Sequence, residues 1–442
     1  MFPSGFLDKM KALLGNEFDA FLASYEQPRN TGLRLNPLKK NLPVFSFCTE
    51  PVPWEPNGFY LQSGSRPGLN PCHDAGAYYL QEPSAMAPAV LLVPQPGERV
   101  LDLCAAPGGK STQLAASLEG RGLLVCNEIH PKRARILSSN IERMGIANAL
   151  VLNEHPAKLA ERFPCWFDKI LVDAPCSGEG MFRKEDAAVT DWSPETVAMC
   201  AARQKEILAS AAGMLKPGGR LVYSTCTFSP EENEGVISSF LKTHPDFSLE
   251  KPEAPWFAPG RPDWIEDPAE NIEYTCRLFP HRLRGEGHFA AVLHRGGAGP
   301  ASELSLQKPA AVPEEISGFF REAGMEFPGQ ILSFGETFFL MPEGLPDLRG
   351  LKVLRAGLEL GEIRKGRFLP AHALSHWLRD YPVSVNFPAD SPEIAAYLRG
   401  ETLAGPQKGW VLVCTEGLGL GWAKGSGGIL KNHCPKGLRR VG

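Results

Sequence analysis

The stretch ERVLDLCAAPGGK at residues 98–110 decides the fold, because a short apolar run leads directly into a glycine-rich loop. The apolar part predicts a buried strand, and a helix is expected to follow over about 110–118. Glycines remove the Cβ atoms that would keep a ligand away from the main chain. The N–H groups of the loop and of the helix N-terminus can then face polar ligand atoms. The sequence therefore predicts a nucleotide-like ligand at this turn.

Two known phosphate-binding loops do not fit this turn. A P-loop needs glycine where Cys104 stands, and Pro107 removes an N–H group, although Gly109-Lys110-Ser111 resembles the end of that motif. The dinucleotide fingerprint G-x-G-x-x-G does not occur in the chain. A turn with only a structural role stays open, but S-adenosylmethionine is the ligand that we expect. Glu128, after the next expected strand, stands where an acid would bind ribose hydroxyls.

Strands and helices alternate on both sides of this stretch. Strands are expected at 98–104, 122–128, 149–152, 168–172, 220–224, 273–278 and 288–294. Helices are expected at 110–118, from Pro131, at 194–215, and from Pro230 with Ser229 as N-cap. The alternation indicates a mainly parallel sheet with helices on both faces, closed by a hairpin. This is the Rossmann-like α/β arrangement of methyltransferases, which by itself does not define a function.

The length of 442 residues allows about three domains, and 43% hydrophobic with 22% charged residues is ordinary for a globular protein. One helix is expected over 5–25. We predict an N-terminal domain (1–72), a methyltransferase domain (73–297), a linker (298–313), a small α/β domain (314–378) and a terminal module (379–442). The chain lacks a signal peptide and an apolar run of roughly 20 residues, so we expect a cytoplasmic protein without a membrane partner.

Positive charge is concentrated at two places, although the net charge is −4. Residues 27–49 contain no acid, and the same holds for residues 417–442. The basic residues in these stretches are Arg29, Arg34, Lys39, Lys40, Lys424, Lys431, Lys436, Arg439 and Arg440. Clustered positive charge is typical of phosphate binding. A solvated basic surface is the alternative interpretation.

Two of the eleven cysteines directly follow expected strands. Cys176 lies in DAPCSG (173–178) and Cys226 in STCT (224–227). Because ligands bind at the carboxyl ends of strands in open α/β sheets, both thiols should point into the cofactor cleft. This pattern favours covalent catalysis over two buried strand-end cysteines. The chain has no Cys-x-x-Cys pair, so we expect neither a metal site nor a disulfide framework.

Three motifs together resemble the Sun/Fmu family of S-adenosylmethionine-dependent RNA cytosine-5 methyltransferases. They are VLDLCAAPGGKSTQLA (100–115), VDAPCSGEGMFRK (172–184) and YSTCTFSPEENEGVI (223–237). RLFPHRLRGEGHFAAVL (277–293) is similar to the family's closing hairpin, and HDAGAYYLQEPSAMAPAVLL (73–92) to the segment before its core. GWAK (421–424) and KNHCPKGL (431–438) look like the bacterial RsmF-type (YebU-like) branch, which modifies small-subunit ribosomal RNA. The resemblance implies a small N-terminal RNA-binding domain and a PUA-like RNA-binding fold for the terminal module.

The resemblance also implies a cofactor site. The residues expected to line the methionine and ribose parts of S-adenosylmethionine are Cys104, Ala105, Ala106, Pro107, Gly108, Gly109 and Lys110. Glu128 would bind the ribose hydroxyls, Arg133 would support the site, and Asp173 would lie beside the sulfonium and the target base. Many relatives carry an aspartate near the adenine after the third strand. This chain reads LNEHP at 152–156, and Asn153 is the candidate for that contact.

The chemistry explains why the family needs two thiols. Carbon 5 of cytosine is a weak nucleophile until a thiolate adds to carbon 6. By resemblance, Cys226 attacks, Cys176 assists release, and Asp173 favours protonation of the base at nitrogen 3. An ordinary thiol, with a pKa of about 8.5, is mostly protonated at neutral pH. The helix expected from Pro230 would favour the Cys226 anion through its dipole.

The target base must leave its stack to reach a thiol, so the substrate should be single-stranded or flipped. The basic stretches would then hold the phosphates, and Arg29, Asn30, Arg34 and Asn36 are candidate contacts. We expect a monomer that methylates cytosine in 16S ribosomal RNA. The alternatives are a transfer-RNA methyltransferase and a non-catalytic ribosome assembly factor. A small-molecule methyltransferase would have little use for the basic flanks.

Overall fold

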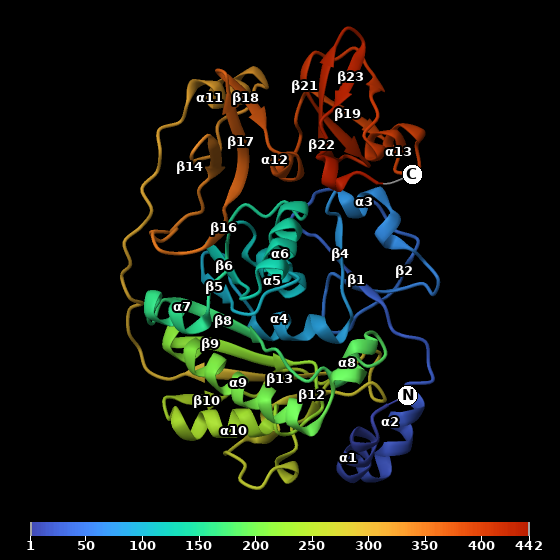
Figure 1. Ribbon diagram of the computed structural model, residues 1–442, viewed down its shortest axis with the longest axis vertical. Coiled ribbons are helices and arrows are strands. Elements are labelled where there is room, and N and C mark those ends of the chain that lie inside the picture. The colour runs from blue at the N-terminus through green and yellow to red at the C-terminus, as the bar shows by residue number, and fades with distance from the viewer. Residues whose placement is uncertain (1, 441–442) are drawn as a thin grey trace.

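The structure is a computed structural model that describes residues 2–440. Met1 and Val441–Gly442, at the outer ends of the first and last predicted domains, lie outside the described residues. In Figure 1 the central sheet occupies the lower half of the molecule and two C-terminal modules lie above it.

The centre of the molecule is a ten-stranded sheet. Its main path runs β11-β12-β13-β9-β8-β5-β6-β7-β16, and β10 pairs with β13. The bounds are β5 (Arg99–Asp102), β6 (Leu123–Asn127), β7 (Ala149–Leu152), β8 (Phe167–Asp173), β9 (Leu215–Thr225), β10 (Phe247–Leu249), β11 (Ala258–Pro259), β12 (Cys276–Leu278), β13 (His288–Arg295) and β16 (Val353–Ala356). Strands β5 to β9 pair in parallel, whereas β13 is antiparallel to β9. The expected Rossmann-like methyltransferase sheet with its closing hairpin is confirmed.

Helices cover both faces of this sheet because alternate strand residues point to opposite sides. Val100 of β5 packs in one hydrophobic core with residues of α4 (Ala87–Leu92), α5 (Gly109–Leu118) and α6 (Pro131–Arg143). Its neighbour Leu101 packs in the other core. The helices of that second face are α7 (Pro156–Arg162), α9 (Pro194–Met214) and α10 (Glu234–Thr243).

The N-terminal part contains three short α-helices and a four-stranded sheet ordered β2-β3-β1-β4. Their bounds are α1 (Ser4–Leu14), α2 (Phe18–Ser24), β1 (Gly32–Leu35), β2 (Cys48–Pro51), β3 (Gly58–Leu61), α3 (Pro71–Asp74) and β4 (Tyr78–Leu80). The prediction of one helix over 5–25 is wrong, because the chain breaks at Gly15, whose φ is +54°, and passes through a 3-10 turn. β4 carries the sheet beyond residue 72, and the predicted domain boundaries stay predictions.

The C-terminal part contains two further sheets, β14-β15-β17-β18 and β19-β21-β22-β23-β20. The bounds of the first module are α11 (Glu314–Glu322), β14 (Ile331–Phe334), β15 (Thr337–Leu340), β17 (Leu358–Arg364), β18 (Arg367–Pro370) and α12 (His372–Trp377). Those of the second are β19 (Ser384–Phe387), α13 (Pro392–Arg399), β20 (Leu403–Ala404), β21 (Gly409–Thr415), β22 (Leu418–Ser426) and β23 (Ile429–Asn432).

Strand β16 connects the first C-terminal module to the core. It pairs antiparallel with β7, with Val353 opposite Leu152, and so forms one edge of the central sheet. Nothing in the pattern of its four residues indicated this partner.

The helix expected to begin at Pro230 begins instead at Glu234, after a series of turns. The Ser229 hydroxyl donates to Glu179 and does not cap a helix. The helix whose dipole was expected to favour the Cys226 anion therefore starts one turn farther along the chain than predicted.

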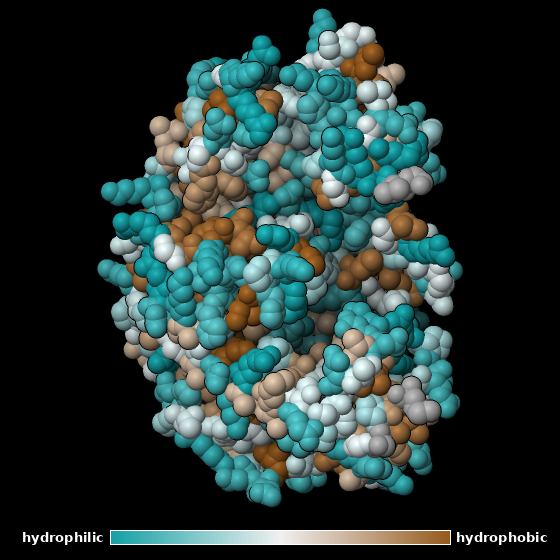
Figure 2. Space-filling model, viewed as in Figure 1, coloured by the Kyte–Doolittle hydropathy of each residue, from teal (hydrophilic) through white to brown (hydrophobic). Residues whose placement is uncertain are grey.

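The face in Figure 2 is mostly hydrophilic, with separate hydrophobic patches. None of the helices that the structure describes is both long and apolar enough to cross a membrane.

Candidate active site

The predicted cofactor loop lies between β5 and α5 and is fixed from two sides. The Ala105 N–H donates to the carbonyl of Asn127 at the end of β6, 2.8 Å away. From α6, Arg133 donates to the Ala106 carbonyl at 2.7 Å and Asn140 to the Pro107 carbonyl at 2.8 Å. The loop is therefore held by the Ala105 N–H group and by the carbonyls of Ala106 and Pro107.

Gly108 is favoured as glycine by its backbone conformation, and the space beside it is tight. Its φ is +113°, and a Cβ atom there would lie 3.2 Å from the Leu137 side chain. Nearby, the Asp102 carboxylate is fully buried, and its Oδ1 has no hydrogen-bond partner among the described residues. A backbone-lined loop beside an unfilled buried acceptor fits a ligand that carries both carboxylate and ammonium groups, as the methionine part of S-adenosylmethionine does.

Glu128 and Asn153 lie side by side at the ends of β6 and β7. Glu128 is buried, and its carboxylate accepts from the His130 N–H at 2.9 Å and lies 3.3 Å from Arg133. The Asn153 side-chain nitrogen donates to the carbonyls of Glu128 (2.7 Å) and Ile129 (2.8 Å). Asn153 thus holds the backbone that carries Glu128, and only its amide oxygen is left for the predicted adenine contact.

Asp173 ends β8 and forms an ion pair with Lys110 of the cofactor loop. Its Oδ2 lies 2.7 Å from Lys110 Nζ, and its Oδ1 accepts from the Ser224 hydroxyl at 2.7 Å. Burial alone would raise the pKa of this carboxyl group, but the positive charge and the hydrogen bond of Lys110 outweigh burial and lower it. Asp173 is therefore a carboxylate at neutral pH.

The two predicted catalytic cysteines meet at the same edge. Cys176 Sγ and Cys226 Sγ are 3.3 Å apart, and the Cys226 N–H donates to Cys176 Sγ at 3.4 Å. The neighbouring sulfur and burial raise the pKa of Cys176 well above its ordinary value. Cys176 therefore keeps its proton, and Cys226 is the sulfur that can accept a hydrogen bond from it.

A buried carboxylate beneath the thiols ties their two loops together. Glu232 accepts from the Ser177 N–H at 3.0 Å, from the Ser177 hydroxyl, and from Gln204 at 2.8 Å. The Ser177 hydroxyl also lies 2.8 Å from that of Thr227, which follows Cys226. Burial raises the pKa of Glu232 to about 7. Glu232 lies two residues after Pro230, where a helix was expected to begin, and nothing in the sequence indicated this role.

A second buried carboxylate connects the N-terminal helix α1 to the site. Glu179 accepts from Lys9, from Trp192 at 2.8 Å and from the Phe228 N–H at 3.0 Å. The Gly180 N–H donates to the Cys226 carbonyl at 2.8 Å, so the loop that contains Glu179 touches the thiol loop directly. Spacing along the chain carried no signal for a contact between Lys9 and residue 179.

His288 is a further residue that the sequence analysis did not assign to the site. It is 6% exposed, and its Nε2 lies 3.8 Å from Asp173 Oδ1. Its position at the start of the closing strand, beside Thr225 at the end of β9, was the available signal.

Two of the four predicted RNA contacts are wrong. Arg34 and Asn36 are each 1% exposed. Arg34 donates to Gly109 O and Thr112, and Asn36 to the carbonyls of Gly76 and Met144, so both are structural. Arg29 is exposed and Asn30 is half-buried. Lys39 is also engaged, because it donates to the His376 carbonyl.

The C-terminal module presents an aromatic and basic row across three strands. Trp410 of β21 is opposite Lys424 of β22, which in turn is opposite Lys431 of β23. Lys424 Nζ lies 5.2 Å from the Trp410 ring centre, and both lysines are exposed. We call Trp410, Lys424 and Lys431 the aromatic–basic row.

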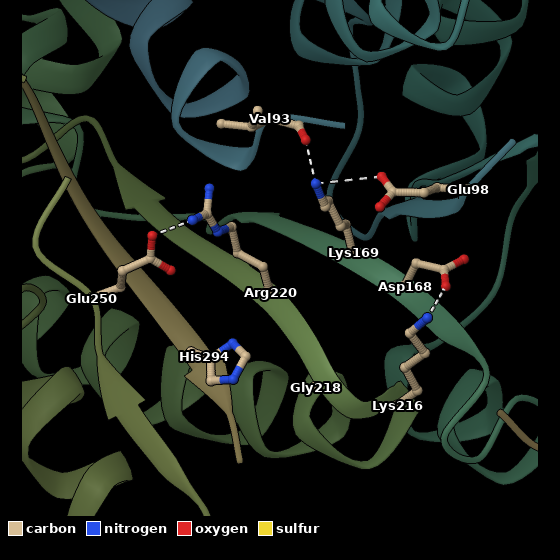
Figure 3. Close-up of a pocket in the computed structure, with 9 residues that line it drawn as sticks. All are labelled: Val93, Glu98, Asp168, Lys169, Lys216, Gly218, Arg220, Glu250 and His294. Carbon is tan, nitrogen blue, oxygen red and sulfur yellow. Dashed lines mark hydrogen bonds and ion pairs between the residues drawn. The ribbon is translucent and has the colours of Figure 1, made fainter. Parts of the chain in front are cut away.

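A separate cavity of about 480 Å³ lies at the opposite, amino end of the parallel strands. Figure 3 shows its cations paired with acids: Lys169 with Glu98, Lys216 with Asp168, and Arg220 with Glu250. Because these charges are neutralised within the protein, none of the three described cations that line the cavity is free to bind a phosphate.

Family models match almost the whole chain. They are 16S rRNA methyltransferase RsmB/F at residues 89–294, the N-terminal domain of 16S rRNA methyltransferase RsmF at 2–83, the RsmF first C-terminal domain at 318–378 and the RsmF PUA domain at 384–440.

Individual proteins agree with these matches. Ribosomal RNA small subunit methyltransferase F of Escherichia coli O139:H28 is 33% identical over 472 residues, covering 100% of this chain and 97% of its own. The protein of the same name from Erwinia tasmaniensis is 30% identical, with the same coverage. The crystal structure of a methyltransferase homologue from Pyrococcus horikoshii superposes with a TM-score of 0.60 at 31% identity, covering 66% of this chain and 95% of the other. The chain therefore belongs to the RsmF family of S-adenosylmethionine-dependent 16S rRNA methyltransferases.

Proposed function

We propose that this chain methylates carbon 5 of a cytosine in 16S ribosomal RNA through a covalent bond to Cys226. The observation that carries the proposal is the pair of sulfurs 3.3 Å apart, beside an Asp173–Lys110 ion pair and the cofactor loop. A structural pair of cysteines would not need this carboxylate and this loop at the same edge of the sheet.

Attack begins at Cys226. Its thiolate forms a bond to carbon 6 of the flipped cytosine, and the electron pair of the C5–C6 double bond moves through the ring toward nitrogen 3, which takes a proton from solvent. The Asp173 carboxylate accepts a hydrogen bond from the new N3–H group and stabilises the adduct. Cys176, which keeps its proton, stabilises the attacking sulfur as an anion by donating to it.

Release reverses the covalent step. S-adenosylmethionine, when bound, supplies the methyl group that carbon 5 takes. A base then removes the proton of carbon 5, the C5–C6 double bond forms again, nitrogen 3 returns its proton to solvent, and the C6–S bond breaks with its electron pair going to Cys226. The Cys176 thiol hydrogen-bonds the leaving sulfur, so loss of Cys176 should slow release more than attack.

Substrate binding is proposed to use the aromatic–basic row. Aromatic side chains stack on exposed bases, and lysines bind phosphates, in proteins that hold single-stranded nucleic acid. The family points to 16S rRNA, whereas no feature of the described residues favours transfer RNA. The cytoplasmic location and monomeric state stay predictions that cell fractionation and gel filtration would test.

The test is methyl transfer from labelled cofactor to 16S rRNA and to assembled small subunits. Cys226→Ala should abolish it, and Cys176→Ala should accumulate a protein–RNA adduct that survives denaturation. Cys48→Ala, a half-buried cysteine of the N-terminal sheet, is the matched control and should behave as wild type. Full activity of Cys226→Ala would refute the nucleophile, and exchanged behaviours would reverse the roles.

Bisulfite sequencing of RNA from a deletion strain identifies the substrate. Loss of 5-methylcytosine from 16S rRNA is expected. Loss from transfer RNA alone would instead establish the alternative enzyme. Cofactor binding that calorimetry fails to detect would favour the non-catalytic assembly factor.

A further inference from the structure

His288 presents an unused hydrogen-bond acceptor to the site. Its Nδ1 lies 2.9 Å from the carbonyl of Gly287, and a carbonyl can only accept, so Nδ1 carries the proton in the neutral ring. Nε2 is then a lone-pair acceptor, and it has no partner among the described residues. A buried polar atom without a partner is uncommon in folded proteins and needs an explanation.

The ring is held in this direction by its neighbours. Gly287 has a φ of +124°, and a Cβ atom there would lie 2.4 Å from the Phe228 ring, so only glycine fits. His288 is the first residue of β13, directly after Gly287, and it pairs with Leu278 of β12. The start of β13 also lies beside the end of β9. Because Gly287 packs closely against Phe228, the backbone position of His288 is fixed. The His288 Nε2 atom lies 3.8 Å from Asp173 Oδ1.

Asp173 by itself does not select cytosine. As a carboxylate it accepts hydrogen bonds, and both of its oxygens already accept, from Lys110 and Ser224. Uracil has an N–H group at nitrogen 3, whereas neutral cytosine has only a lone pair there. A carboxylate at this position would therefore favour uracil unless another group rejects it.

The two bases differ most clearly at carbon 4. Cytosine carries an amino group, which donates, and uracil carries a carbonyl oxygen, which accepts. An acceptor facing that position attracts the amino group and repels the carbonyl oxygen. A buried acceptor that is left unpaired by the wrong base gives strong discrimination.

We propose that His288 Nε2 accepts a hydrogen bond from the exocyclic amino group of the target cytosine and so excludes uracil from the site. This inference rests on the proposed function. His288 acts as a specificity-determining residue that contacts the base, and Asp173 acts on nitrogen 3 of the same base.

The experiment compares His288→Phe with wild type on three RNAs. Each RNA is the 16S fragment that bisulfite sequencing identifies, with cytosine, uracil or pyrimidin-2-one at the target position. Pyrimidin-2-one keeps the nitrogen 3 acceptor and lacks the amino group. Phenylalanine keeps a buried ring of similar size and has no acceptor. His294→Phe is the matched control, because His294 lies on the same strand at its exposed far end.

Wild type should prefer cytosine to pyrimidin-2-one in kcat/KM, and His288→Phe should lower that preference by about 10- to 100-fold, the effect of one unmade buried hydrogen bond. The two bases differ in intrinsic reactivity, but this difference is the same for both proteins. It therefore cancels when the preference of His288→Phe is divided by that of wild type. The preference for cytosine over uracil should fall at least as far. His294→Phe should leave both preferences unchanged.

Unchanged preferences in His288→Phe would overturn the inference while leaving the proposed function intact. An active Cys226→Ala control would instead refute the proposed function itself. If calorimetry shows that His288→Phe no longer binds cofactor, the same base preferences are measured with His288→Gln. Its amide oxygen restores an acceptor, so it should keep most of the preference for cytosine, and loss of that preference with cofactor bound would refute the inference.

Discussion

Glu232→Gln should stabilise the protein increasingly as the pH rises. The Glu232 carboxylate is fully buried, and burial raises its pKa from 4.5 to about 7. Between pH 4.5 and about 7, Glu232 holds a proton in the native protein that it has released in the unfolded chain. The free energy of unfolding of wild type should therefore fall as the pH rises through this window and level off above it.

The size of the effect follows from the pKa. One pKa unit corresponds to about 1.4 kcal/mol, so a rise from 4.5 to about 7 costs the ionised form about 3 kcal/mol. Glutamine does not titrate and fits the same partners. Its oxygen can accept from the Ser177 N–H and from Gln204, and its NH₂ group can donate to the Ser177 hydroxyl, which then donates to Thr227.

Urea unfolding of both proteins at pH 4.5, 6 and 8 measures the difference. Glu232→Gln should gain about 3 kcal/mol over wild type between the lowest and the highest pH. Glu232→Ala is the control, because it leaves the partner groups buried and unsatisfied and should destabilise at every pH by about 1–3 kcal/mol for each. A difference between Gln and wild type that does not change with pH would refute the reasoning.

Four further substitutions test other parts of the protein. Lys110→Met removes the charge that lowers the pKa of Asp173, so methyl transfer should fall more steeply than in wild type as the pH is lowered; superimposable pH–rate profiles would contradict this. Gly108→Ala places a side chain at a φ of +113° and should lower the free energy of unfolding by about 1–3 kcal/mol and weaken cofactor binding in calorimetry; unchanged values of both would argue against the tight loop. Lys424→Gln and Lys431→Gln should each lower the slope of log K against log salt for RNA binding by about 1, and an unchanged slope would exclude the row from phosphate contact.

The sequence predicted the sheet and the thiol pair because local signals and topology suffice for both. Apolar runs define the parallel strands, and residues that follow such strands must meet at one edge. Cys176, Cys226 and Asp173 all follow strands, and the structure brings them together.

The remaining contacts depend on tertiary packing, which leaves no periodic pattern. The charge of Arg34 led to the prediction that it contacts phosphate. In the structure it is buried and donates to the cofactor loop instead. Glu232 lies close to an expected helix start, but its carboxylate turns back into the protein to bind Ser177. Gly15 was expected inside a helix, although its positive φ ends α1.

Strand β16 has a consequence for how the chain is made. The parallel strands leave the ribosome first, and β7 then has an unpaired edge until Val353–Ala356 follows much later. An exposed strand edge can pair with other chains. A nascent chain truncated before residue 353 should therefore be prone to aggregate even though its proposed catalytic residues are complete. The segment that leads into the first C-terminal module thus protects the exposed edge of the central sheet.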